Sequence, residues 1–452
     1  MKPLQTLASL VLAFWVTFSF IQPAWAFCGF YVAKADTKLY NKASQVAIAR
    51  DGKRTILTME NDYQGDVKDF AIVVPVPVLL KEEQVRVGDP KIMERLDSFS
   101  APRLVEYFDS NPCDVVMADQ LLLAAPSSAS TGEAMNQAAQ RRDALGVTVE
   151  AKFTVGEYDI LLLSAKESGG LETWLIQNGY KMPPGARQLL QPYIRQQMKF
   201  FVAKVNLTEF DKSGFQSLRP LMIAYESPKF MLPIRLGMMN AQTDQDLIVY
   251  LLSPKGQIEL TNYRTVKVPS DVEIPEFVKG EFGPFYQAMF QTAYTREDRR
   301  VGFLEYAWDM AGCDPCSADP LNYEELRKAG VFWLSPNQPT NVFITRLHVR
   351  YSRDKFPEDL MFQETSNRQQ FQGRYILQHP YTGEMTCSAA RDYKRSVRQR
   401  VERQVQTLAK LTGWNIQEIR KKARVADSEP EPWWERAFSS TFLGRMVDWW
   451  RS

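Results

Sequence analysis

Short apolar runs rich in β-branched residues, separated by turn residues, dominate residues 27–123 of the chain. The clearest of these runs are SQVAIAR, RTILTMENDY and DFAIVVPVPV. Asp51-Gly52 lies between the first two runs, and this pair predicts a β-hairpin because both residues tolerate the backbone angles of a tight turn. We therefore predict a strand-rich N-terminal region, with a helix near APRLVEYF.

The next two regions differ in how much apolar surface their side chains can bury. Residues 124–146 are rich in Ala, Ser and Gln, and we predict a flexible loop there. Residues 147–274 form an α+β region in which strand-like runs surround helix-like segments. VTVEAKFTVGEYDILLLSA predicts two strands that turn at Gly156, and LETWLIQNGY predicts a helix.

Helical spacing is prominent in residues 275–390, which we predict to be a helix-rich region with returning strands. The apolar stripe of one such helix consists of Phe282, Tyr286, Met289 and Ala293. Residues at intervals of three or four form one helix face, which is typical of packing against a core. FLEYAWDMAG continues the helical pattern, and we predict that this helix ends at Gly312.

The segment VFITRLHVRYS predicts a returning strand, because its apolar and polar residues alternate. Its polar face carries Arg346, His348 and Arg350. The two arginines could receive an anionic ligand, with Arg353 beyond them. A charged sheet face in contact with water is the simpler interpretation, and it makes His348 a surface residue.

The C-terminal segments differ from the rest of the chain in composition. Residues 391–424 hold eleven Lys or Arg against three acids, with apolar residues along one helical face. We predict a basic amphipathic helix over residues 391–425, which could pack by its apolar face or lie against an anionic surface. Residues 426–452 are predicted to be a linker and a Trp-rich tail. Tryptophan is favoured at membrane interfaces, so the tail is a candidate for peripheral membrane contact or for docking on a protein partner.

Together, these patterns predict an α+β fold with largely antiparallel strands, inserted helices and a more helical C-terminal third. The length of 452 residues is enough for two or three domains, and 45% of apolar residues is ordinary for a globular protein. The formal net charge is only +2. A chain so close to neutral lacks the charge excess of nucleic-acid-binding proteins, and we predict no nucleic-acid partner.

The first 26 residues have the three parts of a secretory signal peptide. Lys2 gives the positive start, and an almost uncharged apolar run extends from Leu7 to Ile21. This run is shorter than the ~18 residues that usually span a bilayer. Ala24-Trp25-Ala26 then provides a cleavage site of the small-x-small type. We therefore expect an exported protein, periplasmic or extracellular, cleaved after this site.

Export changes how the cysteines are interpreted, because an oxidising compartment favours disulfide bonds. There are five cysteines, namely Cys28, Cys113, Cys313, Cys316 and Cys387. An odd number leaves one of them free or bonded to another chain. We expect structural disulfides that involve Cys313, Cys316 and Cys387, and a bridge between Cys28 and Cys113 across the N-terminal strands.

Two chemical alternatives remain for the pair Cys313 and Cys316. A dithiol oxidoreductase would need the pair at a helix N-terminus, directly after a strand, where the helix dipole lowers the thiol pKa. The helix predicted before the pair argues against that arrangement. A zinc hydrolase would need four metal ligands, and the candidate set is Cys313, Cys316, Cys387 and His379.

Scarce histidine limits other hydrolase mechanisms. The chain has two histidines, so a Ser-His-Asp triad would have to use His348 or His379. The Gly-x-Ser-x-Gly elbow is absent from the sequence. We assign no catalytic residue and no cofactor, and we favour a non-enzymatic envelope or surface protein that binds or scaffolds a partner.

The order of several short motifs resembles a known family. These motifs are Cys28-Gly29-Phe30-Tyr31, NDYQGD, VVPVP, WL…NGY around Trp174 and Tyr180, LPIRLG, EYAW and CDPC. Their succession, from about residue 28 to Cys387, resembles the secreted bacterial proteins of domain-of-unknown-function family 2330. The resemblance implies an exported, envelope-associated protein and supplies no catalytic residues. The basic helix and the Trp-rich tail lie beyond it.

Overall fold

The chain divides into two compact units, each assembled from separate segments. Unit 1 comprises Met1–Arg103, Leu123–Ser270 and Ala293–Arg374, and unit 2 comprises Leu104–Leu122, Asp271–Thr292 and Tyr375–Ser452. The computed structural model describes residues 30–33, 40–41, 44–60, 63–64, 70–114, 146–180, 185–215, 217–239, 244–314 and 316–423. The predicted signal peptide, Cys28, nearly all of the predicted flexible loop and the predicted Trp-rich tail lie outside these described residues.

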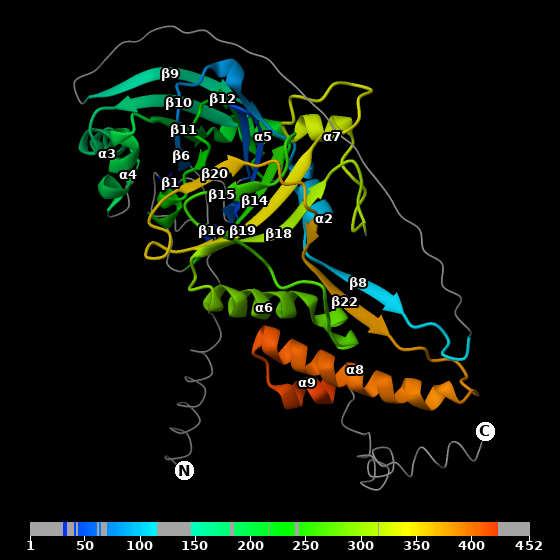
Figure 1. The fold of residues 1–452 in the computed structure, drawn as a ribbon. Coiled ribbons are helices and arrows are strands. Elements are labelled where there is room, and N and C mark those ends of the chain that lie inside the picture. The colour runs from blue at the N-terminus through cyan, green and yellow to red at the C-terminus, as the bar shows by residue number, and fades with distance from the viewer. Residues whose placement is uncertain are drawn as a thin grey trace, which may run out of the picture. The chain divides into compact units, whose positions relative to one another are not determined.

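A five-stranded antiparallel sheet forms one layer of unit 1 (Figure 1). Its strands, in spatial order, are β1 (Phe30–Ala33), β6 (Phe70–Val76), β11 (Lys199–Val205), β10 (Tyr158–Ala165) and β9 (Val147–Val155). The hairpin of β9 and β10 turns at Gly156, whose positive φ of 55° favours glycine. This hairpin confirms the two strands predicted around Gly156.

A nine-stranded sheet forms the second layer of unit 1. Its strands, in spatial order, are β16 (Arg264–Lys267), β18 (Val301–Asp309), β19 (Phe343–Tyr351), β14 (Gln245–Ser253), β3 (Ser44–Asp51), β4 (Arg54–Glu60), β12 (Leu221–Glu226) and β7 (Val85–Val87), with β21 (Phe371–Gln372) paired to β18. The pairs β14–β3 and β16–β18 are parallel, and the other pairs are antiparallel. The tight hairpin of β3 and β4 confirms the prediction from Asp51-Gly52.

The two sheets bury one face of each against the other. Phe201 of β11, Val249 of β14 and Ile48 of β3 belong to this shared core. Helices cover part of the outer faces, namely α2 (Pro90–Ser100), α3 (Ser168–Gln177), α4 (Ala186–Arg195) and α7 (Tyr323–Lys328). α3 and α4 pack on the five-stranded sheet, whereas α2 and α7 pack on the nine-stranded sheet. Unit 1 is therefore a sandwich of helices, sheet, sheet and helices.

The remaining elements of unit 1 are short. They are β2 (Tyr40–Asn41), β5 (Tyr63–Gln64), η1 (Glu82–Gln84), α5 (Leu207–Ser213), β13 (Met231–Leu232), η2 (Arg235–Met239), β15 (Ile258–Leu260) and β20 (Leu360–Glu364). A small sheet with the order β13-β20-β15 and a pair of β2 with β5 account for the short strands among them.

Unit 2 combines helices with a three-stranded sheet of order β17-β22-β8. Its elements lie wholly or mostly within this unit and are β8 (Arg103–Phe108), β17 (Val272–Glu273), η3 (Glu276–Glu281), α6 (Phe282–Arg296), β22 (Arg374–His379), α8 (Ala389–Thr412) and α9 (Ile416–Lys422). The core of the unit includes Phe285 of α6, Tyr375 of β22 and Leu408 of α8. The left-handed backbone of Gly413 ends α8, so the predicted basic helix is in fact two helices.

The fold class is confirmed, because the structure is α+β and most of its strand pairs are antiparallel. The helix predicted from the stripe that begins at Phe282 is α6, and the strand predicted over VFITRLHVRYS is β19. Helices α8 and α9 account for part of the helical C-terminal third that the composition predicts.

Two segments predicted as helices are strands. FLEYAWDMAG lies mostly in β18, where every residue from Val301 to Ala307 is buried. A strand buried on both faces has the same continuous apolar run as a buried helix, so the pattern alone does not separate them. APRLVEYF mostly forms β8, because Pro102 disfavours helical backbone at the residue before it, and α2 ends there.

Candidate functional site

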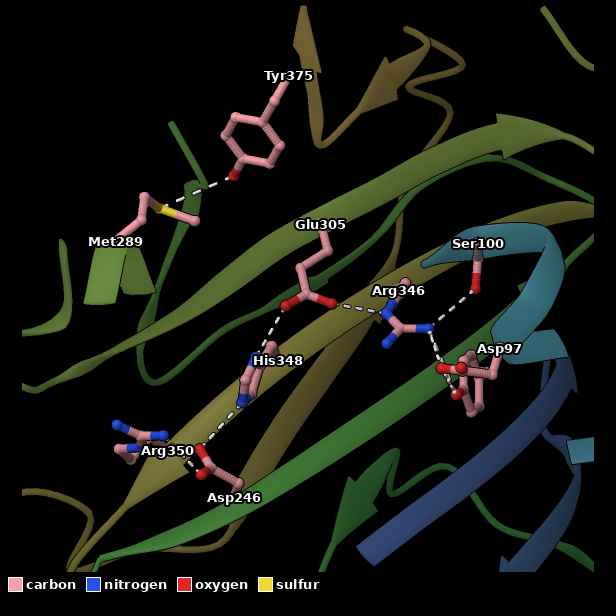
Figure 2. Close-up of polar contacts among 10 residues, drawn as sticks. Asp97, Ser100, Asp246, Met289, Glu305, Arg346, His348, Arg350 and Tyr375 are labelled. Carbon is pink, nitrogen blue, oxygen red and sulfur yellow. Dashed lines mark hydrogen bonds and ion pairs between the residues drawn. The ribbon is translucent and has the colours of Figure 1, made fainter. Parts of the chain in front are cut away.

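A chain of alternating charges crosses the face of the nine-stranded sheet on which α2 packs (Figure 2). Its members, in spatial order, are Asp97, Arg346, Glu305, His348, Asp246 and Arg350. Each neighbouring pair is joined by a nitrogen-to-oxygen distance between 2.6 and 2.9 Å. All six residues belong to unit 1, and we refer to them as the charge network.

The pairing of β14 with β19 positions one end of the charge network. Alternation along β19 places Arg346, His348 and Arg350 on one face. Asp246 of β14 lies directly opposite Arg350 in the antiparallel register. Its two carboxylate oxygens accept hydrogen bonds from Arg350 at 2.8 and 2.7 Å, and its Oδ1 lies 2.9 Å from Nε2 of His348.

An irregularity in β18 positions the centre of the charge network. Phe303 pairs with His348 and Tyr306 pairs with Arg346, with a register shift between them that makes Glu305 the extra residue of a β-bulge. Its Oε1 lies 2.8 Å from Nδ1 of His348, and its Oε2 accepts from Nε of Arg346 at 2.6 Å. The bulge therefore allows one carboxylate to reach two cationic partners on β19.

The charged neighbours outweigh burial in setting the pKa values of His348 and Asp246. Glu305 is 1% exposed and His348 is 9% exposed. Burial lowers the pKa of His348, but the carboxylates of Glu305 and Asp246 outweigh it and hold this pKa above its ordinary value. Burial also acts to raise the pKa of Asp246, yet His348 and Arg350 outweigh it and lower this pKa to about 2. The two carboxylates therefore favour the imidazolium form of His348.

The functional groups of the charge network are largely occupied by one another and are poorly placed to act on a substrate. A protonated His348 has no lone pair and cannot act as a general base. Arg346 and Arg350 already bind carboxylates of the same chain. The predicted water-exposed face is therefore wrong, and so is the predicted surface position of His348, because this face is largely buried and its charges are compensated internally.

Sequence reasoning missed the acidic members of the charge network. Asp97 and Glu305 lie 249 and 41 positions from Arg346 along the chain, and Asp246 lies 102 positions from His348. Residues that pair over such separations leave no local sequence pattern from which the pairing could be predicted. One signal was available, since Glu305 is a lone acid within the apolar run VGFLEYAW. An acid in a segment without a polar face needs a buried cation beside it.

Four cysteines form two disulfides in the structure. Cys113 bonds to Cys387 in unit 2, and Cys313 bonds to Cys316 in unit 1. The predicted bridge between Cys28 and Cys113 is therefore wrong. The partner of Cys113 is 274 positions away in the sequence, and sequence alone does not define disulfide connectivity.

The candidate zinc ligands have other partners. Cys313, Cys316 and Cys387 are all disulfide-bonded, so none of them offers a thiolate. The ring nitrogens of His379 lie 2.8 Å from Oε2 of Glu106 and 3.3 Å from Oε1 of Glu276. Over the part of the chain that the structure describes, no group of three or more His, Cys, Asp or Glu could hold a metal ion.

The Cys313–Cys316 pair follows a strand and not the predicted helix, because β18 ends at Asp309. The next helix, α7, begins at Tyr323, so neither sulfur lies at a helix N-terminus. Cys313 is half-buried and packs against the apolar cluster under α2 and α7, whereas Cys316 is exposed.

Helix α8 of unit 2 presents a face of exposed basic side chains near its start. They are Arg391, Lys394, Arg395 and Arg398, and we call them the basic stripe. Intervals of three and four residues place them on one side of the helix. Asp392 pairs with Arg395 at 3.6 Å and is the acid nearest to the stripe in sequence. The second half of α8 is buried through Val405 and Leu408.

Contacts within unit 2 hold the first half of α8 in place. Arg400 donates to both carboxylate oxygens of Asp109, at 3.1 and 2.6 Å, and the hydroxyl of Tyr393 donates to the same carboxylate at 2.5 Å. Burial would raise the pKa of Asp109, but these two partners outweigh it and lower the pKa. Cys387, bonded to Cys113, lies just before the first residue of the helix.

Comparison with known proteins adds one match. A family model described as an uncharacterised protein conserved in bacteria (DUF2330) matches residues 22–363. No curated protein and no solved structure matches the chain. The matched span contains the charge network and the Cys313–Cys316 pair, whereas the basic stripe lies beyond it. Among the described residues, no helix has the length and apolarity needed to cross a membrane.

Proposed function

We propose that this chain, which belongs to the bacterial family DUF2330, is a non-enzymatic binding protein of the bacterial envelope. The family match confirms the resemblance predicted from the order of short motifs. The proposed binding surface is the basic stripe, and the proposed partner is a membrane surface that carries anionic phospholipid. Export is part of the proposal and is supported by the signal-peptide pattern of the first 26 residues.

The fixed display of the basic stripe is the observation that carries this proposal. The contacts of Tyr393 and Arg400 with Asp109 prevent the start of α8 from fraying, and the Cys113–Cys387 disulfide ties the segment that leads into it. A helix whose backbone is held in this way loses less conformational freedom when it binds a surface.

The strength of the attachment follows from the number of charges. Each Lys or Arg close to an anionic membrane contributes about 1 kcal/mol, and Asp392 offsets one of the four charges of the basic stripe, so the stripe contributes about 3 kcal/mol. An attachment of this strength is reversible, and stable anchoring requires a second contribution. The Trp-rich tail predicted over residues 426–452 is the proposed source of that second contribution.

The geometry of the histidines supports a non-enzymatic role. The chain has two histidines, and both lie in the described residues. His348 is held between Glu305 and Asp246, and His379 contacts Glu106 and Glu276. Each imidazole therefore already has carboxylate partners at both nitrogens, an arrangement suited to structure more than to proton transfer.

Vesicle sedimentation with the full mature chain tests the proposal. We expect binding to vesicles that contain anionic phospholipid, weaker binding as salt rises, and much weaker binding to purely zwitterionic vesicles, to which only the tail would contribute. Replacing Arg391, Lys394 and Arg398 by Glu should weaken binding by at least about 100-fold, because three favourable charges of about 1 kcal/mol each are lost.

A control variant of equal charge separates the basic stripe from net charge. Lys53, Arg86 and Lys91 are exposed in unit 1, and replacing these three by Glu changes the net charge equally. The proposal is wrong if both variants lose binding to the same extent. It is also wrong if the unaltered chain ignores anionic vesicles but is retained by an envelope protein through the same stripe, since the partner would then be an acidic protein.

A further inference from the structure

The loop that carries Cys313 and Cys316 is exposed on one side and packed on the other. Cys316 faces solvent, whereas Cys313 packs against the same apolar cluster as Trp308 and Trp333. An attacking thiolate can therefore approach Cys316 more easily than Cys313, and Cys313 is placed to act as the leaving sulfur.

Hydrogen bonds hold this loop independently of the disulfide. Gln372 donates its side-chain amide to the carbonyl oxygen of Asp314 at 2.6 Å, between the two cysteines. The hydroxyl of Ser317 donates to the carbonyl oxygen of Ser98 in α2 at 2.6 Å. Because these contacts do not involve the sulfurs, the two thiols would stay close to each other after reduction and could form the bond again.

The Cys313–Cys316 disulfide restricts the conformations of the unfolded chain only slightly. It joins residues only three positions apart, and the stabilisation from a disulfide grows with the length of the loop that it closes. An accessible bond with a small structural contribution, in a loop held by other contacts, suits reversible chemistry. A bond that closes a long loop, such as Cys113–Cys387, suits permanent structure.

We propose that the Cys313–Cys316 disulfide is a two-electron redox site that accepts electrons from an external dithiol through attack at Cys316. The inference rests on unit 1 alone and does not depend on the proposed membrane binding. Asp314 between the sulfurs and the absence of a helix N-terminus at the pair both disfavour a stable thiolate. The site therefore acts as an acceptor of reducing equivalents and not as a fast nucleophilic catalyst.

The exchange proceeds in two balanced steps. A thiolate of the dithiol attacks Sγ of Cys316 and forms a mixed disulfide, while the bond to Cys313 breaks and its electron pair passes to Sγ of Cys313, which takes up a proton. The second thiolate of the dithiol then attacks the dithiol's own sulfur in the mixed disulfide. Cys316 leaves as a thiolate and is protonated, so the protein gains two electrons and two protons and the dithiol becomes a disulfide.

Redox titration of the native full chain tests this proposal without any substitution. The protein is equilibrated with mixtures of reduced and oxidised dithiothreitol, trapped by alkylation and analysed by peptide mass spectrometry. We expect Cys313 and Cys316 to pass reversibly between the two states while Cys113 and Cys387 stay bonded. Reduction of Cys313–Cys316 only under conditions that unfold unit 1 would overturn the proposal.

Two single variants test which sulfur is attacked. Cys313→Ser leaves Cys316, and we expect this thiol to form a mixed disulfide with oxidised glutathione. Cys316→Ser leaves the half-buried Cys313, and we expect reaction at least about tenfold slower because access limits exchange. Circular dichroism verifies that both variants are folded. Equal rates in the two folded variants would overturn the assignment of Cys316 as the point of attack.

Discussion

Unit 1 and unit 2 differ in how their separate segments are held together. Unit 1 buries two sheets against each other and covers them with helices, so a large apolar core joins its segments, with the charge network in addition. Unit 2 has a smaller core, and a disulfide between residues 274 positions apart closes it. The disulfide of unit 1 joins residues only three positions apart. The long-range covalent bond therefore lies where apolar burial is smaller.

The same kind of ion pair also serves different purposes in the two units. Arg350 with Asp246 in unit 1 and Arg400 with Asp109 in unit 2 are both bidentate pairs of arginine and carboxylate. In the first pair, Asp246 also contacts His348, so the pair belongs to the charge network on the nine-stranded sheet. The second ends at Tyr393 and positions the helix that carries the basic stripe. Fixing a sheet and positioning a helix thus use identical contact chemistry.

The strongest test of this comparison is removal of the long-range disulfide. Replacing Cys113 and Cys387 by Ser should destabilise unit 2 by about 4–5 kcal/mol, because a very long loop in the unfolded chain is no longer closed. Urea unfolding followed by circular dichroism should then show the helices of unit 2 melting before the sheets of unit 1. Coincident transitions in the variant would contradict the view that this bond holds unit 2 together.

The next test removes the central carboxylate of the charge network. Glu305→Gln leaves Arg346 and His348 without their shared counter-charge in a buried position, and should destabilise unit 1 by about 3–5 kcal/mol. Glu324→Gln on exposed α7 is the matched control, with an expected change within about 0.5 kcal/mol. Similar midpoints of urea unfolding for the two variants would show that the network is not structural.

A smaller effect is expected for the short disulfide of unit 1. Replacing Cys313 and Cys316 by Ser opens a loop of few residues, and the loop-entropy relation gives a loss of about 2 kcal/mol. The loss of unfolding free energy in this variant, set against the loss in the variant without Cys113–Cys387, measures how much more the long-range disulfide stabilises the protein than the local one. Equal losses of unfolding free energy in the two would remove the distinction between a local and a long-range bond.

The smallest expected effect is a pH dependence of unit 1 that arises in the charge network. The raised pKa of His348 stabilises the fold fully below its ordinary value of 6.5, and this contribution is lost as pH rises through the folded-state pKa. The lowered pKa of Asp246 gives a contribution that is present above 3.8 and is lost as pH falls towards about 2. The network therefore stabilises unit 1 most between these two ordinary values.

A histidine variant tests the alkaline side of this window. We expect the unfolding free energy of unit 1 to fall as pH rises above 6.5, and His348→Gln to flatten that slope because the titrating group is gone. The stability of unit 2 provides the internal reference in the same urea experiment. An unchanged slope in the variant would assign the dependence to another group.

Local patterns predicted those parts of the fold that depend on neighbours in sequence. Asp51-Gly52 predicted a hairpin because the turn needs only its own residues, and the alternation of VFITRLHVRYS predicted β19. The sequence of β18 predicts a helix because burial on both of its faces removes the alternation that identifies a strand. The sequence correctly indicates that this segment is apolar and buried, but it does not reveal the two-residue period of a strand.

The candidate site could not be predicted because its partners are distant in sequence. His348 looked like a surface residue from its own strand, and only the fold brings Glu305 and Asp246 to its two nitrogens. The same limit applies to the partner of Cys113. In contrast, the basic face of α8 was visible as charge spacing, because all of its residues belong to one helix.

The separation between Cys113 and Cys387 has a consequence for biosynthesis. If the chain is exported from its N-terminus as proposed, Cys113 enters the oxidising compartment before Cys387, and Cys313 and Cys316 enter between the two. Early closure of the short Cys313–Cys316 loop withdraws both of these sulfurs from wrong pairing, because residues three apart find each other quickly. The local bond would thus remove two of the wrong partners of Cys113 before Cys387 arrives.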